Sequence, residues 1–391
     1  MRGRYLALGA LLLVPVAGRA QGPDTASKTD STAKLNATAG TNTKASADTA
    51  VTVTFGGFVD GYYAYDFNHP RTLDRAFTTQ AARHDEFNIN LAFVSVALSG
   101  PHVRGRFAAQ FGTSVQANYA AEPRLGTLSG PDVSRFIQEA FVGYQVAPTL
   151  WIDGGVFFSP FGSENWISRD NWTYTRSFIA DNSPYYESGV KATWQMTPTL
   201  SAQLHLINGW QNVSETNSDK SLGARIDYTP RADVDFAYDA YVGNDQADSL
   251  PSQLRVWQEG IVQLKPTANL QLRGTFDYGL QRRPSAAGGT DYWSGWAAVG
   301  RYQLTQSVAL GARAERYSDP EQIIVVSGQP FGLRVSGESV NIDMAPAPRL
   351  LWRTELRVLQ APDPLFTHGG GLVSAASRHD SFIVTSVALT F

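Results

Sequence analysis

Charged side chains recur at every second position in several stretches of the chain. Arg353, Glu355 and Arg357 form one such set, and Arg273 and Asp277 form another. The positions between them are mostly apolar. Ionised groups spaced in this way can attract or repel charged solutes, but they do not supply the nucleophile, base and orienting group of covalent catalysis. The pattern therefore favours the handling of solutes in water.

This spacing requires β-strands. Successive side chains of a strand point to opposite faces, so alternation gives one apolar face and one polar face. The clearest unit lies at 186–210, where two alternating segments flank the short turn Thr197–Thr199. The chain after residue 51 repeats this unit, with long loops and short turns in alternation. That pattern predicts a transmembrane antiparallel up-and-down β-barrel with short periplasmic turns and long extracellular loops.

About sixteen strands are expected, to within one hairpin. They lie at about 51–68, 87–99, 102–112, 135–146, 150–158, 186–196, 200–210, 220–229, 234–243, 254–264, 270–280, 292–304, 308–317, 333–344, 349–359 and 381–391. The phase slips near Ala92, which predicts a bulge or a patch buried on both faces. Gln138 and Gln258 fall on apolar faces. Arg334 and Glu338 share an apolar parity, so either that end of the strand stands above the membrane or a bulge resets its phase.

The charged faces must line the lumen, because an arginine facing lipid at mid-membrane costs roughly 2–4 kcal/mol. A soluble β-sandwich also alternates, but its strands average about five or six residues, and these run to about ten or more. The residues expected to line the pore are Asp60, Arg104, Arg106, Asp153, Lys191, Arg225, Asp227, Asp239, Arg273, Asp277, Arg313, Glu315, Arg353, Glu355 and Arg357. The same parity holds Asp66, Glu139, Glu187, Asp235, Glu259, Arg301 and Asp343. Most of these charges are expected to form a solvated, mutually paired wall.

The beginning of the chain reads as a targeting segment. Residues 1–20 combine Arg2 and Arg4, a short apolar run and the small residues before Gln21, which predicts a secretory signal peptide cleaved after Ala20. Residues 21–50 are rich in Thr, Ala, Ser and Asn, so we expect a disordered periplasmic tail. Residues 51–391 form the expected outer-membrane barrel.

Composition agrees with this reading. Of 391 residues, 17% are charged and 12% are aromatic, and no cysteine is present to form a disulfide or a thiolate metal site. The net charge of −3 gives no argument for nucleic acid. A sixteen-stranded barrel leaves an aqueous channel, so the predicted function is passive diffusion of small hydrophilic solutes and ions.

The longest loop, 159–185, carries the charges expected to narrow the channel. It is rich in aromatic residues, and loops of more than about 12–15 residues are usually functional or disordered. We expect it to fold into the lumen and set selectivity. Its charged members are Glu164, Arg169, Asp170, Arg176 and Asp181. The alternative is a lid packed over the rim.

Two other functions are open. A structural or adhesive barrel would bind partners through its loops. An outer-membrane hydrolase would need a catalytic set, and His205, beside Ser201 and Gln203, is more simply a solvated wall histidine. The loop run His84–Glu86 and the pair His368 and His379 are read as hydrated loops, so no catalytic residue, metal site or cofactor is expected.

Four segments carry a resemblance to a known family. Phe58–Tyr63, Phe67–Pro70, Phe157–Gly162 and Asn208–Trp210, in this order and spacing, resemble the β-barrel porins of the OmpL-like, porin-2 type. The resemblance implies an outer-membrane barrel with a porin role and no catalytic residues. Pro160–Gly162 is also similar to phosphate-selective porins, but no ladder of lysines or arginines accompanies it here.

The end of the chain suggests partners. The last strand alternates and ends in Phe391, which resembles the signal that the barrel assembly machinery reads in bacterial outer-membrane proteins. The expected partners are this machinery, outer-membrane lipid and small solutes, and a homotrimer is a candidate assembly.

Overall fold

The computed structural model describes residues 50–284, 288–369 and 375–391, so the predicted signal peptide and all but the last residue of the predicted tail lie outside the described residues. Sixteen antiparallel strands close into one barrel. The first eight are β1 (Thr52–Asp66), β2 (Phe87–Ser99), β3 (Val103–Phe111), β4 (Ile137–Ala147), β5 (Leu150–Phe158), β6 (Tyr186–Thr197), β7 (Leu200–Ile207) and β8 (Ser221–Arg231). The others are β9 (Val234–Asn244), β10 (Leu254–Leu264), β11 (Leu270–Arg282), β12 (Thr290–Gln303), β13 (Val308–Asp319), β14 (Leu333–Ala347), β15 (Leu350–Gln360) and β18 (His379–Thr390).

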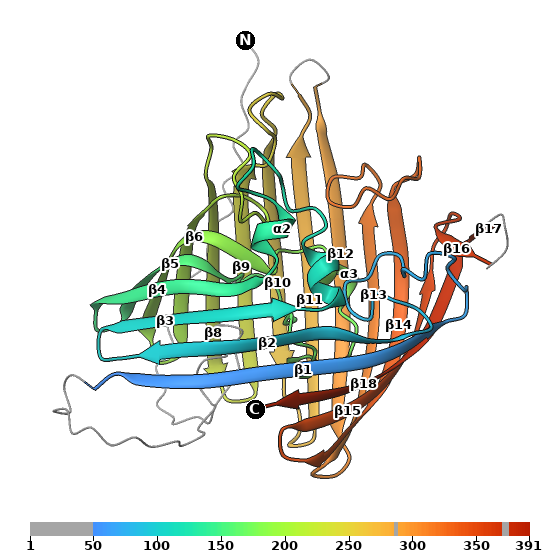
Figure 1. Ribbon diagram of the computed structural model, residues 1–391, viewed down its shortest axis with the longest axis horizontal. Helices are drawn as coiled ribbons and strands as arrows, with labels where there is room; N and C mark the ends of the chain where they lie inside the picture. Colours follow the sequence, from blue (N-terminus) through green and yellow to red (C-terminus); the bar gives the residue numbers. More distant parts are fainter. Residues whose placement is uncertain (1–49, 285–287, 370–374) are drawn as a thin grey trace.

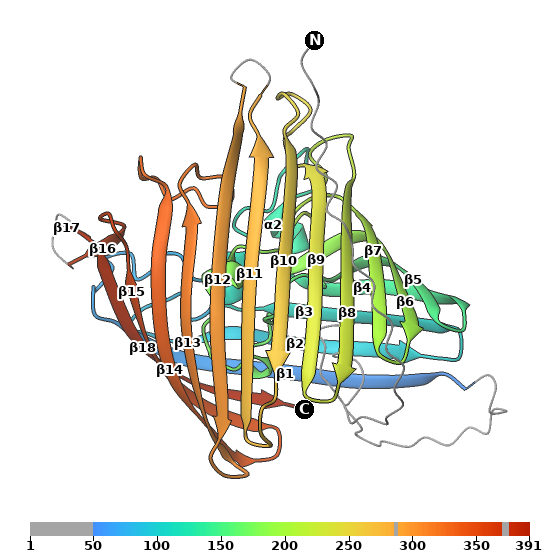
Figure 2. The same ribbon diagram turned by 180° about the vertical axis from the view of Figure 1, so that it is seen from behind.

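The barrel closes where β1 pairs with β18. At this seam the terminal Phe391 exchanges two backbone hydrogen bonds with Gly57, of 2.9 and 3.0 Å. A Cβ atom on Gly57 would lie 2.3 Å from the Phe391 ring, so the ring packs where only glycine leaves room. Figures 1 and 2 show β1–β3 running nearly horizontally across the view and β8–β14 standing upright beside one another.

The long loops contain short helices, a 3₁₀ turn and a small hairpin. They are α1 (Thr113–Asn118), α2 (Pro131–Ser134), α3 (Phe178–Asp181), the 3₁₀ turn Ser168–Asp170 and the hairpin β16 (Phe366–His368) with β17 (Ala375–Ser377). The sequence pattern did not predict them, because each is too short to show a period of its own. No helix among the described residues is long and apolar enough to cross a membrane.

The strand pattern is confirmed: apolar side chains face outward and polar ones inward. Phe55 and Val142, for example, are each 74% exposed on the outer surface, whereas Asp60 and Glu355 are 0% exposed inside. The β1–β2 register shifts at Asn90, close to the phase slip predicted near Ala92.

A bulge explains one of the polar residues that the sequence pattern placed on an apolar face. The β3–β4 register skips Gln138, which turns inward and donates to Gln110 Oε1 at 3.2 Å. Gln258 stays on the outside, where the Tyr238 hydroxyl donates to it at 2.5 Å. The register of β14 is regular from Leu333 to Met344, so no bulge resets the phase of Arg334 and Glu338. Arg334 instead pairs with Asp363 in a long loop, at 2.7 Å.

Candidate functional site

Loop 3 (residues 159–185) lies inside the barrel. Its aromatic residues Trp166, Tyr174 and Phe178 are each 1% exposed, in clusters with inward-facing residues of the wall. Figure 1 shows α3, which belongs to this loop, within the ring of strands. A loop without strand partners must satisfy its backbone groups in another way, and here the charged wall provides the partners.

Carboxylates of β13 and β15 accept hydrogen bonds from the loop backbone. Glu355 accepts from the Tyr174 N–H, the Thr175 N–H and the Thr175 hydroxyl, each at 2.7 Å. Glu315 accepts from the Phe178 N–H at 2.6 Å. Hydrogen bonds to an ionised acceptor are about twice as strong as neutral ones, so these two carboxylates fix the path of the loop.

Arginines of the same wall bind the loop carbonyls. Arg353 donates to the carbonyl oxygens of Ser168, Asn171 and Thr173 at 2.8–3.0 Å, while Asp343 holds its guanidinium at 2.6 and 2.7 Å. The planar guanidinium has five N–H donors, so one side chain can serve several carbonyls at once.

Arg313 is the centre of the charge network. Its guanidinium lies 3.1 Å from Glu315, 3.5 Å from Glu355 and 3.9 Å from Glu164, and it donates to the Thr173 hydroxyl at 2.8 Å. The Arg313 side chain is 0% exposed. Arg313 therefore links β13 and β15 to loop 3 at a place that water does not reach.

Glu164 is the acidic member of the network that the loop itself contributes. Its carboxylate accepts from the Ser177 N–H at 2.7 Å and from the Ser177 hydroxyl at 2.6 Å, and Arg273 lies 3.8 Å away. Burial alone would raise the pKa of Glu164, but the charges of Arg313 and Arg273 and the bonds from Ser177 hold this pKa below its ordinary value. The side chain is thus kept ionised.

The segment Pro160–Gly162 anchors the start of the loop to β8 and β9. The Gly162 N–H donates to Asp239 at 3.0 Å, and Arg225 donates to the Pro160 carbonyl at 2.8 Å. Between them, the Phe161 ring fills a space over Gly223, where a Cβ atom would lie 2.5 Å from the ring.

His205 supports the Phe161 ring. The two rings stack with centroids 5.6 Å apart, and His205 is 2% exposed. Neither ring nitrogen has a hydrogen-bond partner among the described residues. The expectation of a solvated wall histidine is therefore wrong, because loop 3 covers this position.

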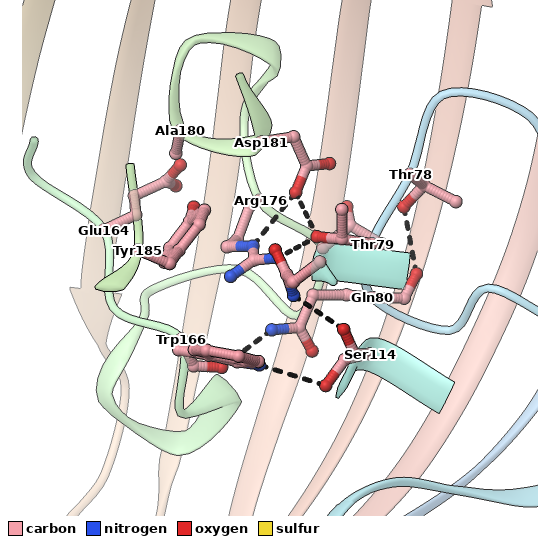
Figure 3. A network of polar contacts seen from close by, with 12 residues as sticks. Thr78, Thr79, Gln80, Ser114, Glu164, Trp166, Arg176, Ala180, Asp181 and Tyr185 are labelled. Carbon is pink, nitrogen blue, oxygen red and sulfur yellow. Dashed lines mark hydrogen bonds and ion pairs between the residues drawn. The ribbon is translucent and has the colours of Figure 1, made fainter. Parts of the chain in front are cut away.

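Loop 1 (67–86) and loop 2 (112–136) interlock with loop 3 (Figure 3). Arg176 lies between Asp181, which it meets at 3.0 Å, and Thr79 of loop 1. Gln80 of loop 1 donates to the Trp166 carbonyl at 2.8 Å, and the Trp166 indole donates to Ser114 of α1 at 3.1 Å. Burial raises the pKa of Asp181 despite the charge of Arg176. No sequence pattern points to Thr79, Gln80 and Ser114, because polar residues in loops have no periodicity.

The tip of loop 3 reaches the end of the barrel that carries the short turns. Arg169 donates to the Thr390 hydroxyl at 3.2 Å and to the carbonyl of Arg349, which lies in the turn between β14 and β15. Asp170 beside it is exposed. The loop therefore runs down the β13–β18 side of the lumen instead of lying across the rim.

The structure divides the predicted pore residues into two groups. Those that contact loop 3 are Asp60, Arg225, Asp239, Arg273, Arg313, Glu315, Arg353, Glu355 and Arg357. Those held by other wall residues are Arg104, Arg106, Asp153, Lys191, Asp227 and Asp277. The expectation of a solvated wall is wrong for the first group, because loop 3 removes it from water.

The sequence pattern did not predict an aromatic cluster that lies inside the barrel. Trp257 on β10 and Trp293 on β12 flank Gly279 and meet Trp210 with ring centroids 5.3 and 6.2 Å away. Trp257 and Trp293 each share the parity of the inward-facing charges on their strand, and this parity could have predicted that they face the lumen. The described residues contain no group of three or more His, Asp or Glu side chains that could hold a metal ion.

Solved structures share this architecture. The outer membrane channel DcaP of Acinetobacter baumannii has a TM-score of 0.56 and 13% identity, over 87% of this chain and 97% of that one. The anion-selective porin from Comamonas acidovorans has a TM-score of 0.56 and 10% identity, over 88% and 100%. OmpT of Vibrio cholerae in its trimer form has a TM-score of 0.55 and 9% identity, over 88% and 100%.

At identities this low, the TM-scores show a common fold and nothing further. None of the curated protein sequences matches the chain. A family model described as "Putative beta-barrel porin-2, OmpL-like" matches residues 52–391, which include every strand of the barrel. The sixteen-stranded wall, its charged interior and this match together place the chain in the OmpL-like β-barrel porin-2 family of outer-membrane porins.

Proposed function

We propose that loop 3 is the constriction of this porin and that small hydrophilic solutes and ions diffuse past it. The observation that carries this proposal is the set of hydrogen bonds between loop 3 and Glu355, Glu315, Arg353 and Arg313. Four charged side chains on two strands bind one loop, which holds it inside the lumen beside β13 and β15.

The open part of the lumen lies at the short-turn end, which is periplasmic in barrels of this type. Inward side chains there are partly exposed and mostly polar. They include Arg104, Gln145, Lys191, Thr193, Ser201, Asp227, Thr229, Gln263, Gln271, Arg301 and Gln303. Such a lining suits solutes that keep their hydration.

Deletion of Trp166–Phe178 should raise the single-channel conductance several-fold, because the segment occupies the lumen beside β13 and β15. The measurement is the conductance of purified protein in planar lipid bilayers. Deletion of residues 247–252 is the control. This segment lies in the loop between β9 and β10, where Leu250 is 55% exposed, and it makes none of the contacts described between loop 3 and the strands.

An unchanged conductance after the Trp166–Phe178 deletion would contradict the constriction. A folded wild-type protein that stays silent in the bilayer would contradict diffusion altogether and would favour a structural or adhesive barrel.

We further propose that the porin assembles as a trimer through the β1–β4 face. Large apolar side chains on this face are unusually exposed: Phe55 to 74%, Phe87 to 88% and Val142 to 74%. The similar OmpT structure of Vibrio cholerae is described as a trimer form. Sedimentation of the unheated protein in mild detergent should give three times the chain mass, and a monomer mass would refute the assembly.

A further inference from the structure

Three basic side chains line one side of the open lumen. Arg104 and Arg106 lie on β3, and Lys191 lies on β6, all on the inward parity. Arg104 is the second residue of its strand and so stands close to the short-turn end. We name the inward surface of β3–β6 around these residues the basic wall.

In these ion pairs the cation is the partner that meets water. The Arg104 side chain is 27% exposed and Lys191 is 17% exposed, while the Asp153 that they share is 1% exposed. The same order holds on β12 and β14, where Arg301 is 23% exposed and its partner Asp343 is 2% exposed. A solute in the lumen therefore approaches the positive end of each pair more closely than the negative end.

The charges in these groups also do not cancel. Arg104 lies 2.6 Å and Lys191 3.9 Å from the single carboxylate of Asp153. Asp343 is likewise shared by Arg301 at 2.5 Å and Arg353 at 2.6 Å. Arg106 pairs with Glu139 at 2.5 Å, so the basic wall sets three cations against the two carboxylates that they pair with.

Aromatic rings lie beside the cations of the basic wall. The Arg104 guanidinium carbon is 4.5 Å from the centroid of the Trp151 ring, and Lys191 Nζ is 5.9 Å from that of Phe141. Trp151 and Phe141 are both partly exposed. A planar anion can thus meet a cation and a ring at one place.

Asp153 and Glu139 of the basic wall are 1% and 9% exposed, and the more exposed acidic side chains of the lumen lie on other strands. Asp227, on β8, is 16% exposed and receives a hydrogen bond from Arg225 at 2.8 Å. Asp235, on β9, is also partly exposed and receives one from Thr229 at 2.7 Å. Strand β7 separates them from the basic wall, so an anion can pass along β3–β6 without meeting them.

We propose that the basic wall is a selectivity surface that attracts small organic anions, carboxylates in particular, and that it retains aromatic carboxylates more strongly than aliphatic ones. This inference rests on the proposed diffusion function. It assigns the solute preference to Arg104 and Lys191, with Trp151 supplying the contact for a ring.

The first test is the reversal potential in a KCl gradient at low salt, where screening is weak. Lys191→Gln should lower the permeability ratio of chloride to potassium by up to about tenfold, because one unit charge about 6 Å away in water changes the partitioning of each ion about threefold and in opposite senses. Asp153→Asn should raise the ratio, because it removes the carboxylate that both cations share. Arg231→Gln is the control, since this arginine is 70% exposed at the last residue of β8, pairs with Asp233 and should leave the ratio unchanged.

The second test compares benzoate with acetate as blockers of the potassium chloride current. Benzoate should block the wild type more strongly, and Trp151→Leu should remove the difference. Equal block of the wild type by both anions would overturn the aromatic preference.

Shifts in reversal potential that are absent or opposite for both Lys191→Gln and Asp153→Asn would overturn the basic wall as a selectivity surface. Absence of any channel in the wild type would instead refute the diffusion function, so the two failures are distinguishable. Lys191→Gln is expected to lower the permeability ratio and Asp153→Asn to raise it. If one variant fails to fold, the other still tests the proposal.

Discussion

Replacement of Arg313 by methionine should release loop 3 from the β13 wall. The change removes the cation that contacts Glu164, Glu315 and Glu355 together. Arg273 stays 3.8 Å from Glu164 and Arg357 stays 2.6 Å from Glu315, but the ion pair of Arg313 with Glu355 is lost. Removal of one partner of a buried ion pair typically costs about 3–5 kcal/mol. The cost falls mainly on loop 3, because the hydrogen bonds between the strands do not depend on this side chain.

Two measurements can detect the release of loop 3 in Arg313→Met. Single-channel conductance should rise toward that of the Trp166–Phe178 deletion, and added protease should cleave within loop 3 while the strands stay intact. Arg316→Met is the matched control, because Arg316 lies on the same strand with its side chain on the exposed outer surface. If Arg313→Met kept the conductance and protease resistance of the wild type, the network around Arg313 would not be what holds the loop.

Replacement of Gly223 by leucine should detach the other end of loop 3. A Cβ atom at this position would lie 2.5 Å from the Phe161 ring, so the ring must leave its stack on His205. Loss of a buried phenylalanine from its site costs about 3–5 kcal/mol. The neighbouring bonds from Gly162 to Asp239 and from Arg225 to Pro160 then lose their geometry.

The expected readouts for Gly223→Leu are a noisier and larger single-channel current and a lower midpoint of thermal unfolding. Gly260→Leu serves as the control, because no atom lies within 4 Å of a Cβ at that position. Phe161→Ala should produce a similar current, and the double variant should be no worse than either single one, since both act on the same contact. Additive effects would mean that Gly223 does not act through Phe161.

The alternation of side chains was sufficient to predict the barrel. A strand exposes every second residue to the same surroundings, so lipid outside and water inside leave a period that one sequence can show. The inward position of Arg353, Glu355 and Arg357 follows from that period. The strand count, predicted to within one hairpin, also used the alternation of long loops and short turns. Exceptions such as Gln138 could not be resolved in this way, because a bulge depends on the register with the neighbouring strand.

The sequence by itself determined which residues face the lumen, but only the tertiary structure decided what they meet there. Tyr174 and Glu355 are 181 positions apart, and Arg225 and Pro160 are 65 apart, so no local pattern links them. Their contacts form because loop 3 has unsatisfied backbone groups and the closed wall offers charged partners away from water. The same contacts turn most of the expected solvated wall into a packed one and leave open water to Arg104, Lys191 and their neighbours at the short-turn end.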